Sequence, residues 1–163
     1  MARLFGTDGV RGIANADLSC ELALQIGAAG AYVLTSAVHN PRILVGMDTR
    51  RSGDMAALTA GICSVGGDVL NVGVIPTPAM AYLARLYEAD AAVMISASHN
   101  TMEYNGIKWF DGDGFKLSDA LEDEIERLIR ERTELPHPTG VGVGHAIEAR
   151  RAVDEYKAFL CGT

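Results

Sequence analysis

The sequence predicts an α/β fold: a three-layer α/β/α domain with a mixed, mostly parallel sheet and helices on both faces. Two observations predict it. Short apolar runs alternate along the chain with segments whose apolar residues recur at helical spacing, so that each crossover helix can cover the sheet between two parallel strands. In addition, 48% of the 163 residues are hydrophobic, which is ample for a packed core and argues against intrinsic disorder.

The elements of the first half follow in order. Ser19 is predicted as the N-cap of a helix whose apolar stripe consists of Leu22, Ile26, Ala29 and Val33. Residues 43–47 then form a buried strand, and a second helix follows Ser52, with the stripe Met55, Leu58, Ile62 and Val65. Residues 69–74 form the next strand. Thr77-Pro78 starts a third helix, because proline in the first turn forfeits no intrahelical hydrogen bond, and residues 91–95 are another buried strand.

The second half of the chain has a different character. Residues 106–110 and 114–117 flank Asp111-Gly112-Asp113 in the manner of a hairpin, which predicts an antiparallel addition to the sheet. Ser118 is predicted to cap a helix with the stripe Leu121, Ile125, Leu128 and Ile129. Residues 136–144 indicate a loop or edge segment, and residues 151–160 a short amphipathic helix. We therefore expect one domain over residues 1–145, and over residues 146–163 a helix that leaves this domain.

Composition narrows the classes of partner. The chain has 14 Lys and Arg against 21 Asp and Glu, a net charge of −7, and no basic block, so nucleic acid and anionic membranes are poor partners. No apolar run reaches the roughly 18 to 20 residues of a membrane span, and the N-terminus lacks the apolar stretch of a signal peptide, so a cytoplasmic location is expected. Cys20, Cys63 and Cys161 form no C-x-x-C pair and are predicted to be reduced thiols that mostly pack inside the domain.

The segment Ile95-Ser96-Ala97-Ser98-His99-Asn100 is the candidate functional segment. It follows a predicted buried strand, and ligand sites of open α/β sheets lie at the carboxyl ends of the strands. A serine there could carry a phosphoryl group, about −1.5 to −2 charges, if cations and backbone amides offset it. Lys108 and Arg11, the latter in the glycine-rich residues 5–12, are the candidate cations. On the pattern alone, a polar strand-to-loop turn with two surface cations is the simpler interpretation.

Six ordered landmarks resemble the first domain of the α-D-phosphohexomutase family. They are residues 5–12, 46–53, 76–78, 95–100, 105–108 and 114–117. The start F-G-T-D-G-V-R-G, together with I-S-A-S-H-N where glucose and mannose enzymes more often have T-A-S-H-N, resembles the phosphoglucosamine mutase branch of that family. The resemblance implies a four-domain enzyme of which this chain is the first domain, with three further domains as its partners. It also implies that the fragment alone is inactive.

The resemblance further implies roles for the serine loop. Ser98 matches the phosphorylated serine, His99 and Asn100 match its immediate neighbours, and Ser96 matches a position tied to the sugar branch. The implied reaction transfers the phosphoryl group from Ser98 to the free hydroxyl of glucosamine 6-phosphate. A 1,6-bisphosphate intermediate then returns its other phosphate and leaves glucosamine 1-phosphate. The implied activity is therefore that of an isomerase that works by intramolecular phosphoryl transfer.

The resemblance also implies helpers for that transfer. Lys108 and Arg11 match the basic residues that assist the serine, and which of the two manages the hydroxyl proton stays open. A Mg²⁺ ion would bind the phosphate of Ser98 and an aspartate loop of the next domain, which this chain lacks. One position departs from the pattern: Thr101 stands where the family usually has proline, so the rigid exit from the serine loop is lost.

The sequence leaves two other functions open and contains one segment that resembles a metal loop. A phosphoglucomutase or phosphomannomutase of the same family differs in a sugar loop outside this chain. A non-catalytic α/β interaction domain would retain the fold without ever carrying phosphate on Ser98. Finally, residues 111–114 could be taken for a metal loop, but Phe115 and Lys116 stand where a calcium loop needs an oxygen ligand and a glycine, so a hairpin turn is expected there.

Overall fold

One six-stranded mixed sheet forms the centre of the molecule. The computed structural model describes residues 3–35, 40–54 and 57–162. The strands are β1 (Val10–Ile13), β2 (Arg42–Met47), β3 (Asp68–Val74), β4 (Ala91–Ile95), β5 (Tyr104–Asp111) and β6 (Ala146–Glu148), in the spatial order β1-β5-β4-β2-β3-β6. The pairings of β2 with β3, β2 with β4 and β3 with β6 are parallel, whereas β5 is antiparallel to both β4 and β1. The predicted mixed, mostly parallel sheet is confirmed.

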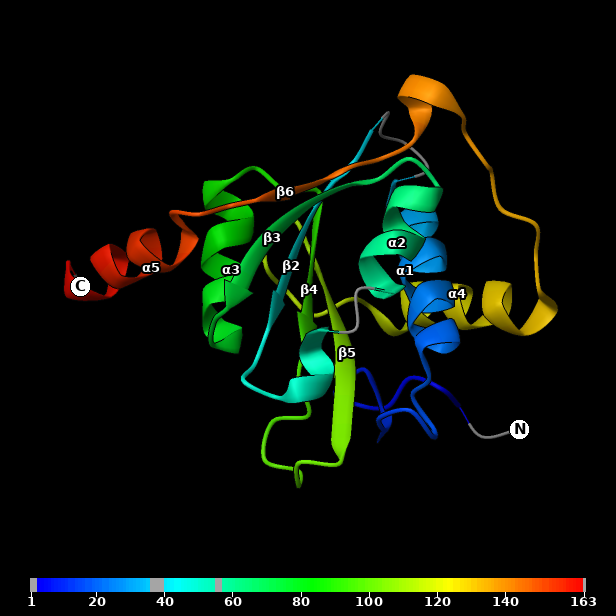
Figure 1. Ribbon diagram of the computed structural model, residues 1–163, viewed down its shortest axis with the longest axis horizontal. Coiled ribbons are helices and arrows are strands. Elements are labelled where there is room, and N and C mark those ends of the chain that lie inside the picture. The colour runs from blue at the N-terminus through cyan, green and yellow to red at the C-terminus, as the bar shows by residue number, and fades with distance from the viewer. Residues whose placement is uncertain (1–2, 36–39, 55–56, 163) are drawn as a thin grey trace.

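Helices cover both faces of this sheet, as predicted. The helices are α1 (Cys20–Thr35), α2 (Ala57–Ser64), α3 (Thr77–Leu86), α4 (Asp119–Glu131) and α5 (Ala152–Cys161), with short 3-10 turns at Arg51–Asp54 and Gly140–Gly142. In Figure 1, α1, α2 and α4 lie on one side of the strands, and α3 and α5 lie on the other. The architecture is therefore the three-layer α/β/α sandwich that the alternating pattern indicated. No helix in the described part of the chain is long and apolar enough to cross a bilayer.

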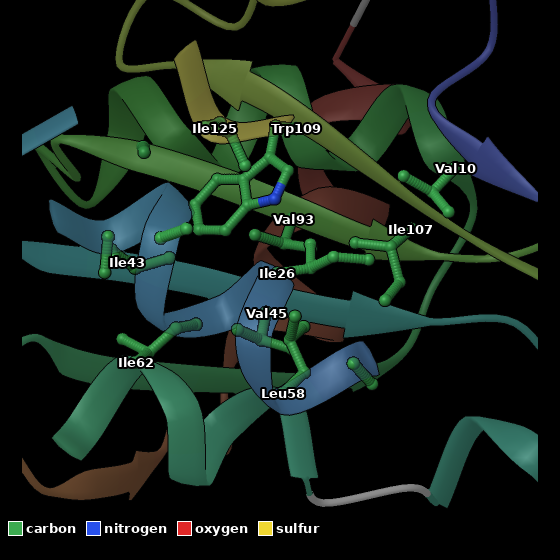
Figure 2. Packing of buried hydrophobic residues seen from close by; sticks show 14 of the residues in the cluster. Val10, Ile26, Ile43, Val45, Leu58, Ile62, Val93, Ile107, Trp109 and Ile125 are labelled. Atoms are coloured by element: carbon green, nitrogen blue, oxygen red, sulfur yellow. The ribbon is translucent and has the colours of Figure 1, made fainter. Parts of the chain in front are cut away.

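Two hydrophobic cores flank the sheet, because successive side chains of a strand point to opposite faces. Along β4, Val93 packs into the core under α1, α2 and α4, whereas Met94 packs into the core under α3. Figure 2 shows the first core, where the ring of Trp109 lies among the aliphatic side chains of the sheet and of α1 and α4. A strand buried on both faces must be apolar throughout, which is why residues 91–95 could be recognised as a strand.

The predicted caps are confirmed. The Ser19 hydroxyl accepts a hydrogen bond from the amide of Leu22 at 3.1 Å, and the Ser118 hydroxyl accepts one from the amide of Leu121 at 3.4 Å. Helix α3 begins at Thr77, with Pro78 in its first turn. Met55, which was assigned to the stripe of the second helix, lies outside the described residues.

The predicted hairpin forms only in part. Residues 114–117 return along β5 with a single bridge, between Phe110 and Lys116, and make no strand. The second strand that pairs with β5 is instead β1, which runs antiparallel to it. The sequence of residues 5–12 did not predict this strand. Because β1 has only four residues and includes Gly12, it carries no readable alternation, and only its pairing with β5 makes it a strand.

The C-terminal segment lies against the opposite edge of the sheet. Strand β6 pairs in parallel with β3, and α5 then packs on α3, where the rings of Tyr82 and Phe159 stack with centroids 4.1 Å apart. The Tyr87 hydroxyl donates to Glu155 of α5, and burial followed by this hydrogen bond raises the pKa of Tyr87 to about 12. The predicted C-terminal helix is confirmed. The division of the chain at residue 145 stays a prediction.

Two expectations about burial were wrong. Cys20 and Cys161 are exposed free thiols, because they occupy the first position of α1 and the last position of α5; of the three cysteines, Cys63 is the one that is half-buried. Burial, followed by the nearby Asp68 carboxylate, raises the pKa of the Cys63 thiol. On α4, Leu121 of the predicted stripe is exposed, whereas the neighbouring Glu122 is fully buried.

Helices α1 and α2 approach each other through glycine. A Cβ atom on Gly61 would lie 2.1 Å from the carbonyl oxygen of Leu24, and one on Gly27 would lie 2.3 Å from that of Leu58. We expect Gly61→Ala to destabilise the chain by about 2 kcal/mol, because the helix backbones must separate, and this cost exceeds the gain in helix propensity of about 1 kcal/mol. Urea unfolding measures it, with Ala60→Ser on the exposed face of α2 as the matched control. A Gly61→Ala chain more stable than wild type would contradict the close packing.

Candidate functional site

Two loops meet at one edge of the sheet. Strand β4 ends at Ile95, and its parallel neighbour β2 ends at Met47, which pairs with Ile95. The amide of Asp48 donates to the carbonyl of Ile95 at 3.0 Å, so the chain leaving β2 starts directly beside the chain leaving β4. The predicted placement of the serine loop at the carboxyl edge of the sheet is confirmed.

Ser98 lies at the exposed tip of the loop after β4. Its φ angle is 55°, in the left-handed region that costs a non-glycine residue roughly 1 kcal/mol or more. The amide of Asn100 donates to the carbonyl of Ala97 at 3.1 Å, and the buried side chain of Ala97 holds the turn against the domain. The Ser98 hydroxyl lies 3.5 Å from Nδ1 of His99, at the outer limit of a hydrogen bond. The fold therefore presents the Ser98 hydroxyl on a fixed turn that is open to a reactant.

Ser96 links this turn to the loop after β2. Its hydroxyl donates to Oδ2 of Asp48 at 2.7 Å and accepts a hydrogen bond from the amide of Ser98 at 3.0 Å. The same Asp48 carboxylate accepts from Nε of Arg50 at 3.0 Å and from the Arg50 amide at 2.9 Å. Ser96 therefore acts here as a support of the serine loop, connected to a carboxylate that an arginine holds in place.

The two predicted cations lie together through Asp8. Arg11 forms an ion pair with Asp8 at 3.3 Å, and the Lys108 amine is 3.8 Å from the other oxygen of that carboxylate. Arg11 also donates to the side-chain oxygen of Asn100 at 3.1 Å, which joins β1 to the serine loop. The pairing of β1 with β5 places Arg11 opposite Gly106, two residues before Lys108. Arg11 is thus brought to Asn100, which is 89 residues away in the sequence, and through Asp8 to Lys108.

One donor of the Arg11 guanidinium is unpaired within the described part of the chain. This donor is the Nε atom, which is buried. Arg11 and Lys108 carry two positive charges, and among the described residues both pair with one carboxylate, that of Asp8. The group of three side chains therefore has a net positive charge. An excess of positive charge beside a serine hydroxyl suits an anionic group such as a phosphoryl.

The exit of the serine loop is held by hydrogen bonds in place of the absent proline. The amide of Tyr104 donates to the carbonyl of Thr101 at 3.1 Å, closing a turn. A hydrogen bond from the side chain of Thr101, then the backbone hydrogen bond of Glu103 itself and, more weakly, the charge of Arg50 lower the pKa of Glu103. Thr101 thus supplies a constraint that a proline ring would have supplied differently.

We expect Thr101→Val to raise the pKa of Glu103 toward its ordinary value, because the hydroxyl that favours the carboxylate is lost. A carboxyl whose folded pKa is depressed adds stability above its unfolded pKa, and that contribution disappears as the pH falls through the folded pKa. The titration midpoint of the Glu103 carboxyl carbon by NMR measures the shift. Thr59→Val, on α2 and away from the loop, is the control, and an unmoved midpoint in Thr101→Val would contradict the hydrogen bond.

An open groove of about 830 Å³ runs along this edge of the sheet. It is lined by Ser98, Asn100, Asp48, the loop residues 49–52 and the segment 102–103. Within the described residues, no group of three or more His, Cys, Asp or Glu side chains could hold a metal ion.

Sequence reasoning found most of this site but missed two of its members. Ser96, Ser98, His99 and Asn100 lie on the loop, Arg11 contacts it through Asn100, and Lys108 joins Arg11 through Asp8; their chemical roles stay predictions. Asp48 and Arg50 were not singled out, although both belong to the landmark at residues 46–53. Their position directly after a buried strand, at the same sheet edge as Ser98, is the signal that could have found them.

Comparisons with known proteins identify the family of this domain. Residues 2–136 match the family described as phosphoglucomutase/phosphomannomutase, alpha/beta/alpha domain I. A phosphoglucosamine mutase from a Thermoanaerobacter species is 61% identical over the whole chain, and one from Caldanaerobacter subterraneus is 59% identical. The chain spans 37% of the length of these curated relatives.

Solved structures show the same architecture. A phosphoglucomutase/phosphomannomutase family protein from Burkholderia thailandensis superposes with a TM-score of 0.81 at 25% identity, covering 98% of this chain and 35% of that one. A putative phosphomannomutase from Thermus thermophilus gives 0.76 at 27% identity, with 97% and 36% covered. With the three-layer fold and the family match in agreement, this chain belongs to the phosphoglucomutase/phosphomannomutase family, as its α/β/α domain I.

Proposed function

We propose that the protein containing this chain is a phosphoglucosamine mutase, which interconverts glucosamine 6-phosphate and glucosamine 1-phosphate through a phosphoserine at Ser98. The observation that carries the proposal is the exposed Ser98 hydroxyl on a fixed turn, with Arg11 hydrogen-bonded to Asn100 of the same loop and Lys108 joined to Arg11 through Asp8. The choice of glucosamine phosphate as the substrate is supported by relatives that bear the name phosphoglucosamine mutase and are 59 to 61% identical over the full chain.

In the proposed reaction, Ser98 carries the phosphoryl group into each turnover. The bond between phosphorus and the Ser98 oxygen breaks as the hydroxyl oxygen at carbon 1 of glucosamine 6-phosphate bonds to the phosphorus. The result is glucosamine 1,6-bisphosphate and free Ser98, which takes the proton. After the intermediate turns over, the bond between phosphorus and the oxygen on carbon 6 breaks as the Ser98 oxygen bonds to that phosphorus; the Ser98 proton passes to the oxygen on carbon 6, and glucosamine 1-phosphate leaves. Such a transfer depends mainly on positioning and on the compensation of negative charge.

The surrounding residues supply both of these needs. Arg11 reaches the serine loop through its hydrogen bond to the side chain of Asn100. Lys108 sits over the ring of Phe110 and near Asp8, so its amine is held within reach of the same edge. Either Arg11 or Lys108 stabilises the leaving phosphoryl and manages the hydroxyl proton, and pH-rate profiles of Lys108→Met and Arg11→Met would separate their contributions. His99, adjacent to the Ser98 hydroxyl, orients it.

The proposal includes one Mg²⁺ ion, whose chemistry is to neutralise charge on the phosphoryl group. The exposed position of Ser98 fits such an ion, because phosphate oxygens on this hydroxyl can be reached from outside the domain. The described residues contribute no cluster of carboxylates, so its other ligands would come from a further domain of the full protein. The further domains, a hexosamine phosphate substrate and a cytoplasmic location, which the free thiols support, belong to the same proposal.

Mass spectrometry of the full-length protein tests the proposal. After exposure to glucosamine 1,6-bisphosphate and Mg²⁺, the peptide that contains Ser98 should carry one phosphate, and turnover should be fastest with glucosamine phosphates. Faster turnover of glucose or mannose phosphates would instead assign the protein to phosphoglucomutase or phosphomannomutase. A folded protein without phosphate on that peptide would point to a non-catalytic domain.

A further inference from the structure

Arg50 holds the serine loop by its backbone. One of its terminal nitrogens donates to the carbonyls of Thr101 and Tyr104 at 2.6 and 3.0 Å, and the other donates to those of Ser98 and Asn100 at 3.0 and 2.7 Å. These acceptors lie 48 to 54 residues away in the sequence. One side chain thus fixes both the tip of the loop and its exit.

The guanidinium has no donor left for a ligand. A guanidinium carries five N–H groups, and here four go to loop carbonyls while the fifth goes from Nε to Asp48. The side chain is only 12% exposed, packed beneath the loop that it holds. Arg50 therefore differs from Arg11, whose Nε lacks an acceptor in the described chain. Its place in the site is to position the loop and not to bind the sugar phosphate.

The same contacts orient the loop for an anion. In a trans peptide the N–H group points opposite to the preceding carbonyl, and the chain has no cis peptide bond among its described residues. Because the carbonyls of Ser98, Asn100 and Thr101 face Arg50, the amides of His99, Thr101 and Met102 face away from it. These three amides have no acceptor within the described residues, so they remain able to meet a negative group on the open side of the loop.

The loop needs such a support because it is strained and lacks its usual brace. Ser98 has a φ of 55°, and Thr101 provides no ring constraint at the exit. Asp48 orients Arg50 through Nε and, through Ser96, also fixes the amide of Ser98. The two sides of the turn are thus tied to a single ion pair, between Arg50 and Asp48.

We propose that Arg50 is the positioning residue of the phosphoryl-transfer site: seated on Asp48, it sets the backbone of residues 98–104 so that the Ser98 hydroxyl and the loop amides meet the phosphoryl group. This inference rests on the proposed function and deepens it. A lysine at this position keeps the charge but has three donors on a single nitrogen, so it cannot span four carbonyls.

The test compares Arg50→Lys with wild type in the full-length protein. We expect kcat to fall about 100-fold, with KM for the sugar phosphate changed by less than about threefold, because misplacement of a reacting group costs the chemical step and not ground-state binding. Transfer of phosphate from a hexose 1,6-bisphosphate to Ser98 should slow equally, and amide hydrogen exchange over residues 97–104 should become faster. Arg85→Lys is the matched control, because Arg85 donates to one carbonyl, that of Asp113, in a turn far from Ser98 along the chain; it should keep kcat.

Asp48→Asn is the second variant, and it decides the matter if Arg50→Lys does not fold. It keeps the shape of the side chain but removes the negative charge that holds Arg50 in place, so phosphate transfer to Ser98 should also become slower. Wild-type transfer rates and unchanged loop exchange in a folded Arg50→Lys or Asp48→Asn protein would overturn the inference. A wild-type protein that takes up no phosphate would instead refute the proposed function, and loop exchange in Arg50→Lys would still decide whether Arg50 holds the loop.

Discussion

Replacing Ser98 with alanine is expected to lower kcat of the full-length protein by on the order of 10⁴-fold or more, because the oxygen that would carry the phosphoryl group is removed. The effect should be on chemistry and not on folding. Ser98 is exposed, and its hydroxyl has one long contact, to His99, so the change in stability should stay within about 0.5 kcal/mol. Coupled turnover of glucosamine 6-phosphate measures kcat, and thermal unfolding checks the fold.

Ser64→Ala is the matched control for Ser98→Ala. The Ser64 hydroxyl makes one hydrogen bond, to the carbonyl of Gly61 at the end of α2, away from the serine loop. Its removal should leave kcat unchanged. If Ser98→Ala turned over as fast as Ser64→Ala, the phosphoserine mechanism would fail, and an α/β interaction domain without catalysis would explain the chain better.

Lys116→Met is expected to destabilise the chain by about 3 kcal/mol, because it leaves a carboxylate buried without its close partner. Glu122 of α4 is 0% exposed, and its nearest cation is Lys116 at 2.9 Å; Arg3 is farther away, at 3.8 Å. Neither Glu122 oxygen has a well-formed hydrogen bond in the described chain. The charge of Lys116 is therefore the main compensation for that burial. The urea midpoint of unfolding measures the loss.

Two further variants separate the effect of burying an ion pair from the effect of removing a charge. Lys157→Met breaks the pair with Asp154 on α5, where the two side chains are 68% and 81% exposed, and should cost less than about 1 kcal/mol. The double variant Lys116→Met/Glu122→Met removes both members of the buried pair and should regain most of the lost stability. Equal costs for Lys116→Met and Lys157→Met would contradict the importance of burial.

The buried acids of α4 also bear on the site. Next to Glu122, the Glu126 carboxylate accepts hydrogen bonds from the amides of Leu4 and Phe5, at 2.8 and 3.3 Å. These residues lead directly into the segment that carries Arg11. Helix α4, on one face of the sheet, thus anchors the chain that brings a cation to the serine loop.

The sequence by itself determined the layers of the fold and the position of Ser98. Buried strands such as β2 and β4 are apolar throughout, and helices such as α1 repeat their apolar residues every three to four positions, so both are legible without knowledge of distant contacts. The serine loop follows β4, and this local fact places it at the carboxyl edge of a parallel sheet.

Only the tertiary structure decided which partners surround that loop. Strand β1 exists because it pairs with β5, and Glu122 is buried because Lys116 compensates it. Arg50 donates to carbonyls some 50 residues away in the sequence, and no local periodicity of the sequence predicts such a contact. The physical reason is common to all three: periodicity reports which face of an element is apolar, whereas hydrogen bonds and ion pairs between distant segments depend on where the completed sheet brings those segments together.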